Sequence, residues 1–422
     1  MLRKFQNIVC FLFVTLSVTG CAYTKDLTVL SRKQAIYDLD YLVKNLKAKH
    51  PDPFARINEG EFDNHVQQIK ANFGEQTSRK DFSLSIAELL ALIRDDHTRH
   101  TEVPDFVGFR RSGGKVFPLG LRYQNCNMIV NTWPKAIKPQ YLKKGDTIIE
   151  INGRPMESLL EEYRKYISAE TDEQQNWILE GRLHYFLWLK EGECESFELT
   201  LMNSNGVEYT ETIPTLAAEP SKSRNNMKTQ EFFSFDFYLD KKICFFKAQS
   251  FWRELLNDYM RRLKNLISQM KENETSILIV DLRGNGGGHW KFCWELLSRT
   301  TTKSINAGGD IIRPKSDGWD GHLVLLCDRG TASAAVYPAV MVKDCNVGII
   351  AGEETGGRAS YCGNIINIRL PNSNLHCQIA TKYFMRPAGY NDGRGVLPDL
   401  PLDVTLEDSV LVEKIYDYIK AN

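Results

Sequence analysis

The chain has 422 residues, enough for two or three domains, and its apolar (42%) and charged (25%) fractions are those of an ordinary globular protein. Its 53 basic residues balance its 53 acidic residues, so the formal charge is zero. This balance gives no indication of nucleic acid or another polyanion as a partner.

The first 20 residues predict a secretory signal peptide rather than a part of the fold. Arg3 and Lys4 precede an apolar run that is too short for a membrane-spanning helix, and small residues then lead to Cys21. The stretch VTGC, which ends at Cys21, resembles the bacterial lipobox, in which the cysteine is lipidated. We therefore expect removal of residues 1–20 and a lipid anchor at Cys21 that holds the protein in the bacterial cell envelope, at the outer membrane or the periplasmic face. The alternative is a plain signal peptide with an incidental cysteine.

Residues 21–110 predict a small helical domain. Ser31 and Gln34 have the spacing of a capping box, and apolar residues then recur with the helical period as far as Pro51. A second helix is expected over residues 83–96.

Residues 111–220 predict a β domain with a helical insertion. The block 142–156 contains an alternating strand followed by Asn152-Gly153, a typical hairpin turn. This block resembles the PDZ signature, although any β-hairpin with an Asn-Gly turn has the same pattern. Helical patterns follow over residues 157–190.

Residues 225–415 predict an α/β layer, because buried strands alternate with helical patterns. Strands are expected in the stretches KKICFFKAQSF, SILIVDLR, HLVLLCD, NVGIIAGEE and HCQIATKYFMRP. A helix is expected in LLNDYMRRLKNLISQM. The cysteines of the chain have no CxxC spacing, so we expect no structural zinc site.

Ser333 is the candidate nucleophile. It lies in CDRGTASAA, between a buried strand and a helical pattern, where a helix dipole favours developing negative charge. A serine at such a place can also simply cap the helix. This stretch contains no histidine or lysine that could take the proton of its hydroxyl, so the base is expected from elsewhere.

The glycine-rich stretch DLRGNGGG, residues 281–288, follows another buried strand. Backbone N–H groups in such a loop can point together and hold an anion. The Gly-Lys-Ser/Thr sequence of a P-loop is absent, and His289 replaces the third glycine of the dinucleotide fingerprint. The loop can hold phosphate or the oxyanion of an acyl transfer.

Four motifs together resemble the tail-specific, or C-terminal-processing, serine peptidases of family S41. DLRGNGGG, DRGTASAA, GEETGGRAS and GRGVLPDLPLD occur in the order and at the spacing of that family, with the PDZ-like GDTIIEING upstream. The resemblance implies an α/β fold with a crotonase-like (ClpP/crotonase-type) peptidase core, a PDZ-like β domain and an N-terminal helical domain. It also implies a peptide or protein substrate and no metal or cofactor.

The resemblance is closer to the Ser-His-carboxylate branch, which includes the tricorn-type peptidases, than to the Ser-Lys branch. The lysine that closes GxxTxGK in the Ser-Lys branch is Arg358 here, and arginine stays protonated and cannot act as the base. The histidine branch implies His97, in IRDDHTRH, as the general base of Ser333. It implies Asp392, in YNDGRGVLPD, as the carboxylate that holds or tunes the site, at a position where that branch more often has glutamate.

The resemblance further implies an oxyanion hole made of backbone N–H groups from Gly286 or Gly287 and from Ala334. Arg358 is expected to bind a carboxylate of the peptide substrate.

The catalytic candidates also have ordinary structural alternatives. His97 can interact with a helix C-terminus, and Asp392 can belong to a turn. Arg358 can pair with Glu353 or Glu354 instead of a substrate.

The expected function is that of a serine endopeptidase of the bacterial cell envelope, which hydrolyses peptide bonds through an acyl-enzyme on Ser333. The alternative is a catalytically inactive lipoprotein that binds peptides or another ligand on the same scaffold, because Arg358 and Asp392 depart from the two active branches. The sequence does not indicate an oligomeric state.

Overall fold

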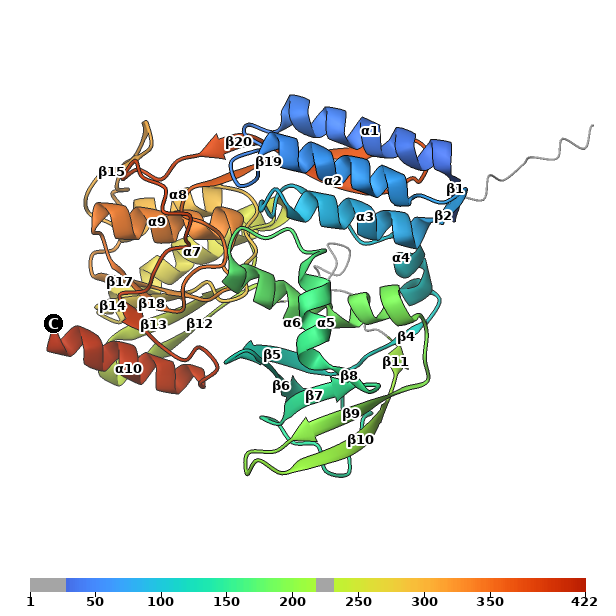
Figure 1. The fold of residues 1–422 in the computed structure, drawn as a ribbon. Coiled ribbons are helices and arrows are strands. Elements are labelled where there is room, and N and C mark those ends of the chain that lie inside the picture. The colour runs from blue at the N-terminus through green and yellow to red at the C-terminus, as the bar shows by residue number, and fades with distance from the viewer. Residues whose placement is uncertain (1–27, 218–230) are drawn as a thin grey trace, which may run out of the picture.

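The computed structural model describes residues 28–217 and 231–422 (Figure 1). The predicted signal peptide and Cys21 lie outside the described residues. None of the helices in the described ranges is both long and apolar enough to span a membrane.

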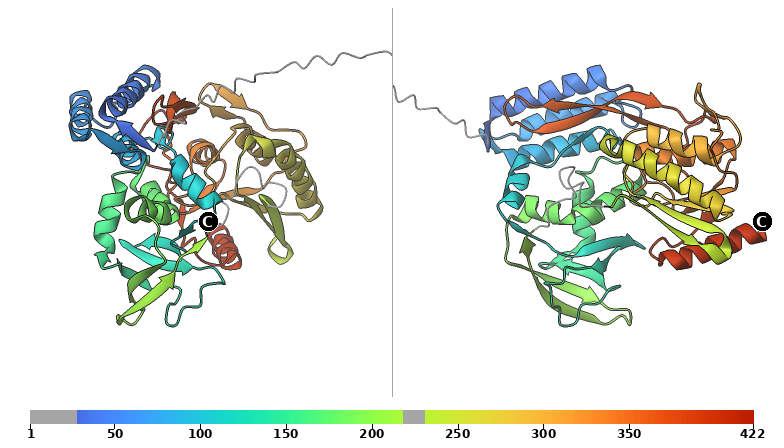
Figure 2. Two further views of the ribbon diagram at one scale, coloured as in Figure 1. Left: turned by 90° about the vertical axis from the view of Figure 1, so that its right-hand side faces the viewer. Right: turned by 180° about the vertical axis from the view of Figure 1, so that it is seen from behind.

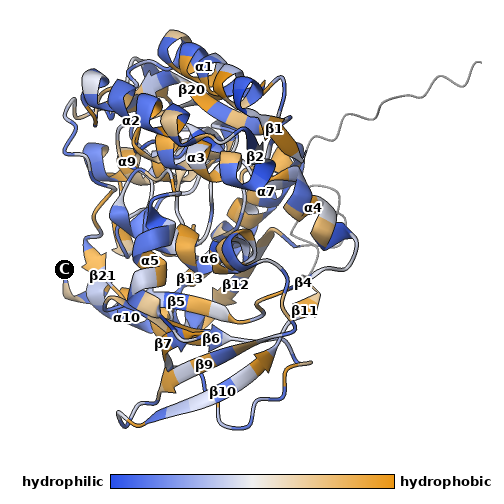
Figure 3. Cartoon of the chain, turned by 45° about the vertical axis from the view of Figure 1, so that its right-hand side comes forward, coloured by the Kyte–Doolittle hydropathy of each residue, from blue (hydrophilic) through white to orange (hydrophobic). Residues whose placement is uncertain are grey.

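Four helices and a short two-stranded sheet form the N-terminal part. They are β1 (Val29–Ser31), α1 (Arg32–Lys49), α2 (Glu59–Asn72), β2 (Gln76–Ser78), α3 (Arg79–Ala91) and α4 (Pro104–Arg111). The predicted capping box of Ser31 and Gln34 is present and starts α1. Helix α3 ends at Ala91 rather than at residue 96, and Arg94 beyond it has a left-handed φ of 55°, which does not continue a helix. Figure 3 shows hydrophilic and hydrophobic residues side by side on α1, as expected for a helix with one buried face.

The middle part is an antiparallel sheet with two helices inserted into it. The strands and helices are β4 (Lys115–Val116), β5 (Gly120–Gln124), β6 (Asn127–Thr132), β7 (Thr147–Ile151), β8 (Arg154–Pro155), α5 (Met156–Arg164), α6 (Asp172–Glu191), β9 (Ser196–Met202), β10 (Glu208–Pro214) and β11 (Leu216–Ala217). The main sheet has the order β10-β9-β7-β6-β5, with β8 paired to β7, while β4 pairs with β11. The predicted hairpin turn is confirmed, because Asn152 and Gly153 both have positive φ, 51° and 71°.

The helical part and the middle part share one hydrophobic core. The fully buried Leu39 of α1, Phe106 of α4 and Leu183 of α6 belong to the same cluster of apolar side chains. The boundary expected near residue 110 therefore does not divide the core, and the predicted domain ranges stay predictions.

The C-terminal part is built on a six-stranded sheet of the order β12-β13-β14-β17-β18-β21. These strands are Phe233–Tyr238, Ile243–Ala248, Ile277–Asp281, His322–Cys327, Ile349–Gly352 and Leu400–Pro401. Strand β12 is antiparallel to β13, and the remaining pairs are parallel. The mixed α/β content and the buried strands predicted from the sequence are confirmed.

Helices cover both faces of this sheet. They are α7 (Leu256–Glu272), α8 (Lys291–Thr300), α9 (Val336–Cys345) and α10 (Asp408–Ala421). Leu278 and Val280 of β14 pack with α7, α8 and α9, whereas Ile277 and Ile279 pack with α10 on the opposite face (Figure 2). Successive residues of a strand face opposite sides of the sheet. Because helices bury both sides, most residues of these strands are apolar, and the sequence shows continuous apolar runs.

A separate sheet links the C-terminal part to the N-terminal helices. Strand β20 (His376–Phe384) lies between β19 (Tyr361–Arg369) and β3 (Arg99–His100). Figure 1 shows β20 running beside α1. Short strands β15 (Ile305–Ala307) and β16 (Asp310–Ile312) form a further pair. The pairing of β3 with β20 fixes the segment that follows α3 against the C-terminal part.

Candidate active site

Ser333 stands at the turn that connects β17 to α9. Strand β17 ends at Cys327, and a short 3-10 helix, η4 (Ser333–Ala335), begins at the serine and leads into α9. Ser333 has a φ of 52°, in the left-handed region that residues with a side chain seldom adopt. Such strain persists where the surrounding structure enforces it, and it is common at functional sites.

The glycine-rich loop 281–288 holds the serine turn in place. The Thr331 hydroxyl donates a hydrogen bond of 2.9 Å to the carbonyl of Leu282, and the Ala332 N–H donates one of 3.0 Å to the carbonyl of Asn285. Both loops follow the carboxyl ends of adjacent parallel strands, β14 and β17. This edge of an α/β sheet is where ligands bind in open sheets generally.

Gly287 packs directly against the backbone of the serine turn. Its φ is 87°, and a Cβ atom at this position would lie 2.6 Å from the nitrogen of Ala334. Its own N–H donates to Oδ1 of Asn285 at 2.9 Å, so Gly287 is not the free oxyanion donor that the sequence suggested. The N–H groups of Gly286 and Ala334, the other two candidates, have no acceptor within the part of the chain that the structure describes.

The structure brings His97 to Ser333. Nε2 of His97 lies 2.9 Å from Oγ of Ser333, within hydrogen-bond distance. His97 lies beyond the end of α3, in the segment that leads to β3, and so it does not cap the helix. Its ring stacks on Tyr361 of β19, with a centroid distance of 5.6 Å and an interplanar angle of 20°.

Glu170, which the sequence did not single out, occupies the place expected for the third member of the site. Its Oε1 lies 3.2 Å from Nδ1 of His97, on the ring edge that faces away from Ser333. Glu170 is buried in the segment between α5 and α6, and its Oε2 accepts the backbone N–H of Arg358 at 2.7 Å. The sequence offered no signal for it, because no motif marks the residue and only the packing of α5 and α6 on the core brings it to His97.

The structure does not bring Asp392 to His97, and this expectation needs correction. The Asp392 side chain is 42% exposed, and its Oδ2 lies 3.9 Å from Nη1 of Arg386. Its Oδ1 accepts the backbone N–H of Arg394 at 3.1 Å, a contact two residues along the chain that is typical of a turn. The turn geometry directs this carboxylate outward, so Asp392 is a turn residue rather than a partner of His97.

Arg358 ties two segments of the site together. Its Nε donates to the carbonyl of Gly393 and its Nη1 to the carbonyl of Arg94, each at 3.1 Å. Burial lowers the pKa of Arg358 to about 10, and neighbouring arginines act in the same direction. The pairing with Glu353 or Glu354 is not formed, since both carboxylates bind other arginines. The guanidinium thus holds the backbone of the His97 segment.

The carboxylates around His97 decide its protonation. Burial alone lowers the pKa of His97, but Asp95 and Glu170 outweigh it, and the pKa of His97 lies well above its ordinary value. Burial raises the pKa of Glu170. The Glu170 carboxylate accepts the proton of Nδ1, which leaves Nε2 as the ring nitrogen that faces Ser333.

Asp95, His97 and Glu170 also form a group whose ligand atoms lie within 4.8 Å of one another, the spacing of a metal site. The same atoms make the His97–Glu170 hydrogen bond described above. A serine hydroxyl, a histidine and a carboxylate in series constitute the machinery of nucleophilic acyl transfer.

Comparisons with known families and proteins support a peptidase. Residues 242–402, which contain Ser333 and the glycine-rich loop, match the model of peptidase family S41. The chain is also 22% identical over 347 residues to the chloroplastic C-terminal processing peptidase of Tetradesmus obliquus, across 76% of this chain and 67% of that protein. Both matches support the expected S41-type peptidase, without distinguishing the Ser-His from the Ser-Lys branch.

Solved structures share the fold. Mature CPAF in complex with lactacystin superimposes with a TM-score of 0.69 at 14% sequence identity, covering 92% of this chain and 98% of that one. Another structure of mature CPAF gives a TM-score of 0.68 at 13% identity, covering 92% and 95% of the two chains. The similarity in fold covers 92% of this chain and therefore extends beyond residues 242–402 into the helical and middle parts.

Proposed function

We propose that this protein is a serine endopeptidase of the tail-specific kind, which cleaves peptide bonds through an acyl-enzyme on Ser333. The observation that carries the proposal is the 2.9 Å contact between His97 Nε2 and Ser333 Oγ. The S41 domain supports peptide or protein chains as the substrate class.

In this mechanism His97 accepts the proton of Ser333 as the hydroxyl attacks the scissile carbonyl carbon. The same nitrogen then gives the proton to the leaving amine, and water hydrolyses the acyl-enzyme by the reverse sequence. Glu170 holds the Nδ1 proton and stabilises the imidazolium that forms, while the N–H groups of Gly286 and Ala334 stabilise the oxyanion.

The inactive binding protein was an alternative because Arg358 and Asp392 left no reliable base. The contact between His97 and Ser333, with Glu170 behind it, supports the enzyme instead.

The test is cleavage of a denatured protein by the purified full chain, with the products identified by mass spectrometry. The proposal predicts new chain ends for the wild type and none for Ser333→Ala. Equal cleavage by both proteins would assign the activity elsewhere.

The proposal also includes a lipid anchor at Cys21 in the bacterial cell envelope, which rests on the sequence VTGC. Cys21→Ser should release the protein from membrane fractions or leave the signal peptide uncleaved. An unmodified mature N-terminus at another residue would contradict the anchor.

A further inference from the structure

Asp95 connects the candidate base to a second histidine in the interior. Its Oδ1 accepts the backbone N–H of His97 at 2.9 Å. Its Oδ2 accepts the hydroxyl of Thr98 at 2.6 Å and lies 3.0 Å from Nε2 of His50. Asp95 is 6% exposed, so its charge depends on these donors rather than on solvent.

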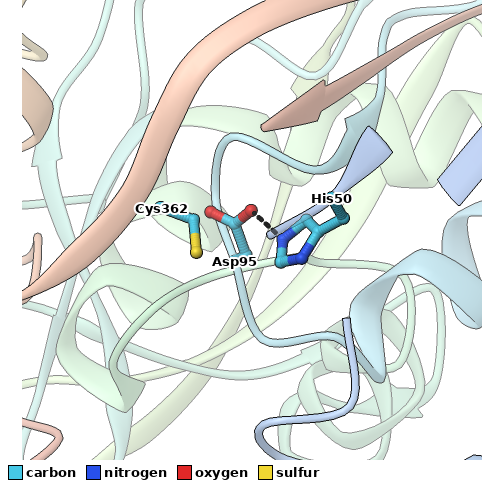
Figure 4. Close-up of side chains that lie close together, drawn as sticks. All are labelled: His50, Asp95 and Cys362. Carbon is cyan, nitrogen blue, oxygen red and sulfur yellow. Dashed lines mark hydrogen bonds and ion pairs between the residues drawn. The ribbon is translucent and has the colours of Figure 1, made fainter. Parts of the chain in front are cut away.

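The backbone fixes the tautomer of His50. This residue follows the last turn of α1, and its side chain is only 2% exposed. The N–H of Asp52 donates to Nδ1 of His50 at 3.1 Å, so Nδ1 offers a lone pair and the ring proton is on Nε2. Figure 4 shows this edge of the His50 ring facing the carboxylate of Asp95, with Cys362 on the other side of the carboxylate. His50 is therefore a donor directed at Asp95.

The same tautomer argues against a metal ion in this cluster. His50, Asp95 and Cys362 bring ligand atoms within 4.8 Å of one another. A proton on Nε2 leaves that nitrogen without a lone pair for a metal. Burial, together with the nearby carboxylates, raises the pKa of the Cys362 thiol to about 12, which opposes the thiolate that metal binding needs. The cluster is held by hydrogen bonds.

Asp95 acts on the ring of His97 as well as on its backbone. Its Oδ1 lies 3.5 Å from Nδ1 of His97, the nitrogen that Glu170 also approaches. The donors around Asp95 outweigh its burial and hold the pKa of its carboxyl well below the ordinary range. Residues 92–98 form neither a helix nor a strand, so this segment depends on such contacts for its shape. A fixed negative charge beside the ring favours the imidazolium that forms during catalysis.

We propose that His50 is a positioning residue for His97 and acts through Asp95. The proposal rests on the proposed function, since it assigns His50 a part in orienting the general base. The Nε2–H of His50 holds the Asp95 carboxylate, and the carboxylate holds the backbone and ring edge of His97. A displacement of a reacting group by about 1 Å can lower a rate about 100-fold, so loss of this donor should affect turnover.

The test compares two replacements of His50 in the full chain. His50→Leu removes the donor, whereas His50→Gln retains an N–H donor on a side chain of similar reach. We expect His50→Leu to lower kcat about 10-fold to 100-fold with little change in KM, and His50→Gln to recover most of the loss. Leu46→Ala, a cavity in the last turn of α1, is the matched control: it should lower Tm and leave kcat unchanged at temperatures well below Tm.

A double-mutant cycle separates this role from a general structural one. If His50 acts through Asp95, His50→Leu should add little to the kcat loss that Asp95→Asn causes alone. A wild-type kcat in His50→Leu, equal losses in His50→Leu and His50→Gln, or additive losses in the double variant would each overturn the proposal.

A measurement on the wild type covers the case in which the variants do not fold. Nitrogen-15 NMR of histidine-labelled protein should show His50 protonated on Nε2 and unprotonated on Nδ1. The opposite tautomer would overturn the role of His50. A wild type that cleaves no protein would instead contradict the proposed function, and the NMR result would still report on His50 separately.

Discussion

His97 lies 2.9 Å from Ser333 through Nε2 and Oγ, although 236 positions separate them in the chain. The two residues belong to different parts of the fold: His97 follows a helix of the N-terminal part, and Ser333 follows a strand of the six-stranded C-terminal sheet. Docking of these parts therefore assembles the site.

Glu170 and Asp392 provide the first prediction, because only Glu170 reaches His97. Glu170→Gln keeps the size of the side chain and removes its charge, so it should lower kcat about 100-fold or more. Asp392→Asn should stay within about threefold of the wild type, as expected of a surface turn. Steady-state kinetics on a denatured protein substrate measures both, and a larger loss in Asp392→Asn than in Glu170→Gln would return Asp392 to the site.

The pH dependence of kcat/KM gives the second prediction. The pKa of His97 is raised above its ordinary value of 6.5, and the base must be neutral to accept a proton. The value of kcat/KM should therefore rise with pH, and this rise should occur at a higher pH than the titration of an ordinary imidazole. Glu170→Gln removes a negative charge that favours the imidazolium, so the rise of its residual activity should move to lower pH. A rise at or below pH 6.5 in the wild type would contradict the charge arrangement described for the site.

Two neighbouring glycines provide the third prediction. Gly287→Ala places a Cβ 2.6 Å from the Ala334 nitrogen at a φ of 87°, so the serine turn must shift. The left-handed backbone alone costs about 1–2 kcal/mol, and we expect loss of activity in addition. Gly286→Ala is the control for stability, because no atom outside Gly286 and its chain neighbours lies within 4 Å of its added Cβ. Urea unfolding should separate the two variants, and equal free energies of unfolding would argue against close packing at Gly287.

Arg358 provides the fourth prediction. Its guanidinium binds the carbonyls of Arg94 and Gly393, so Arg358→Gln should lower the free energy of unfolding by about 1–3 kcal/mol. Arg394→Gln, which breaks a more exposed ion pair with Glu354, should cost at most about 1 kcal/mol. Denaturant unfolding measures the difference. Activity that requires a positive charge at position 358 and survives His97→Ala would show that His97 is not the base.

The sequence predicted the elements whose signals are local. The capping box of Ser31, the Asn152-Gly153 turn and the apolar strands of the six-stranded C-terminal sheet each depend on neighbouring residues, and the structure contains all of them. The end of α3 was misplaced because the apolar pattern continues past Ala91 while the backbone at Arg94 turns left-handed.

In the candidate site, too, only the residues that local motifs mark could be predicted from the sequence. The motifs around Ser333 and His97 were sufficient to select these two residues, and the fold brings them together. Glu170 could not be found in this way, because its role depends on the packing of α5 and α6 rather than on a motif. Asp392 was selected by its spacing from a motif, and spacing does not fix the direction in which a turn points its side chain.

The account depends most on Ser333 as a nucleophile that His97 activates, and labelling by a fluorophosphonate tests this directly. Mass spectrometry of the treated wild type should find the phosphonyl group on Ser333. His97→Ala should be labelled about 1,000-fold more slowly, and Ser333→Ala should not be labelled there. An unlabelled Ser333 in folded wild-type protein, or a labelling rate that His97→Ala leaves unchanged, would contradict the account.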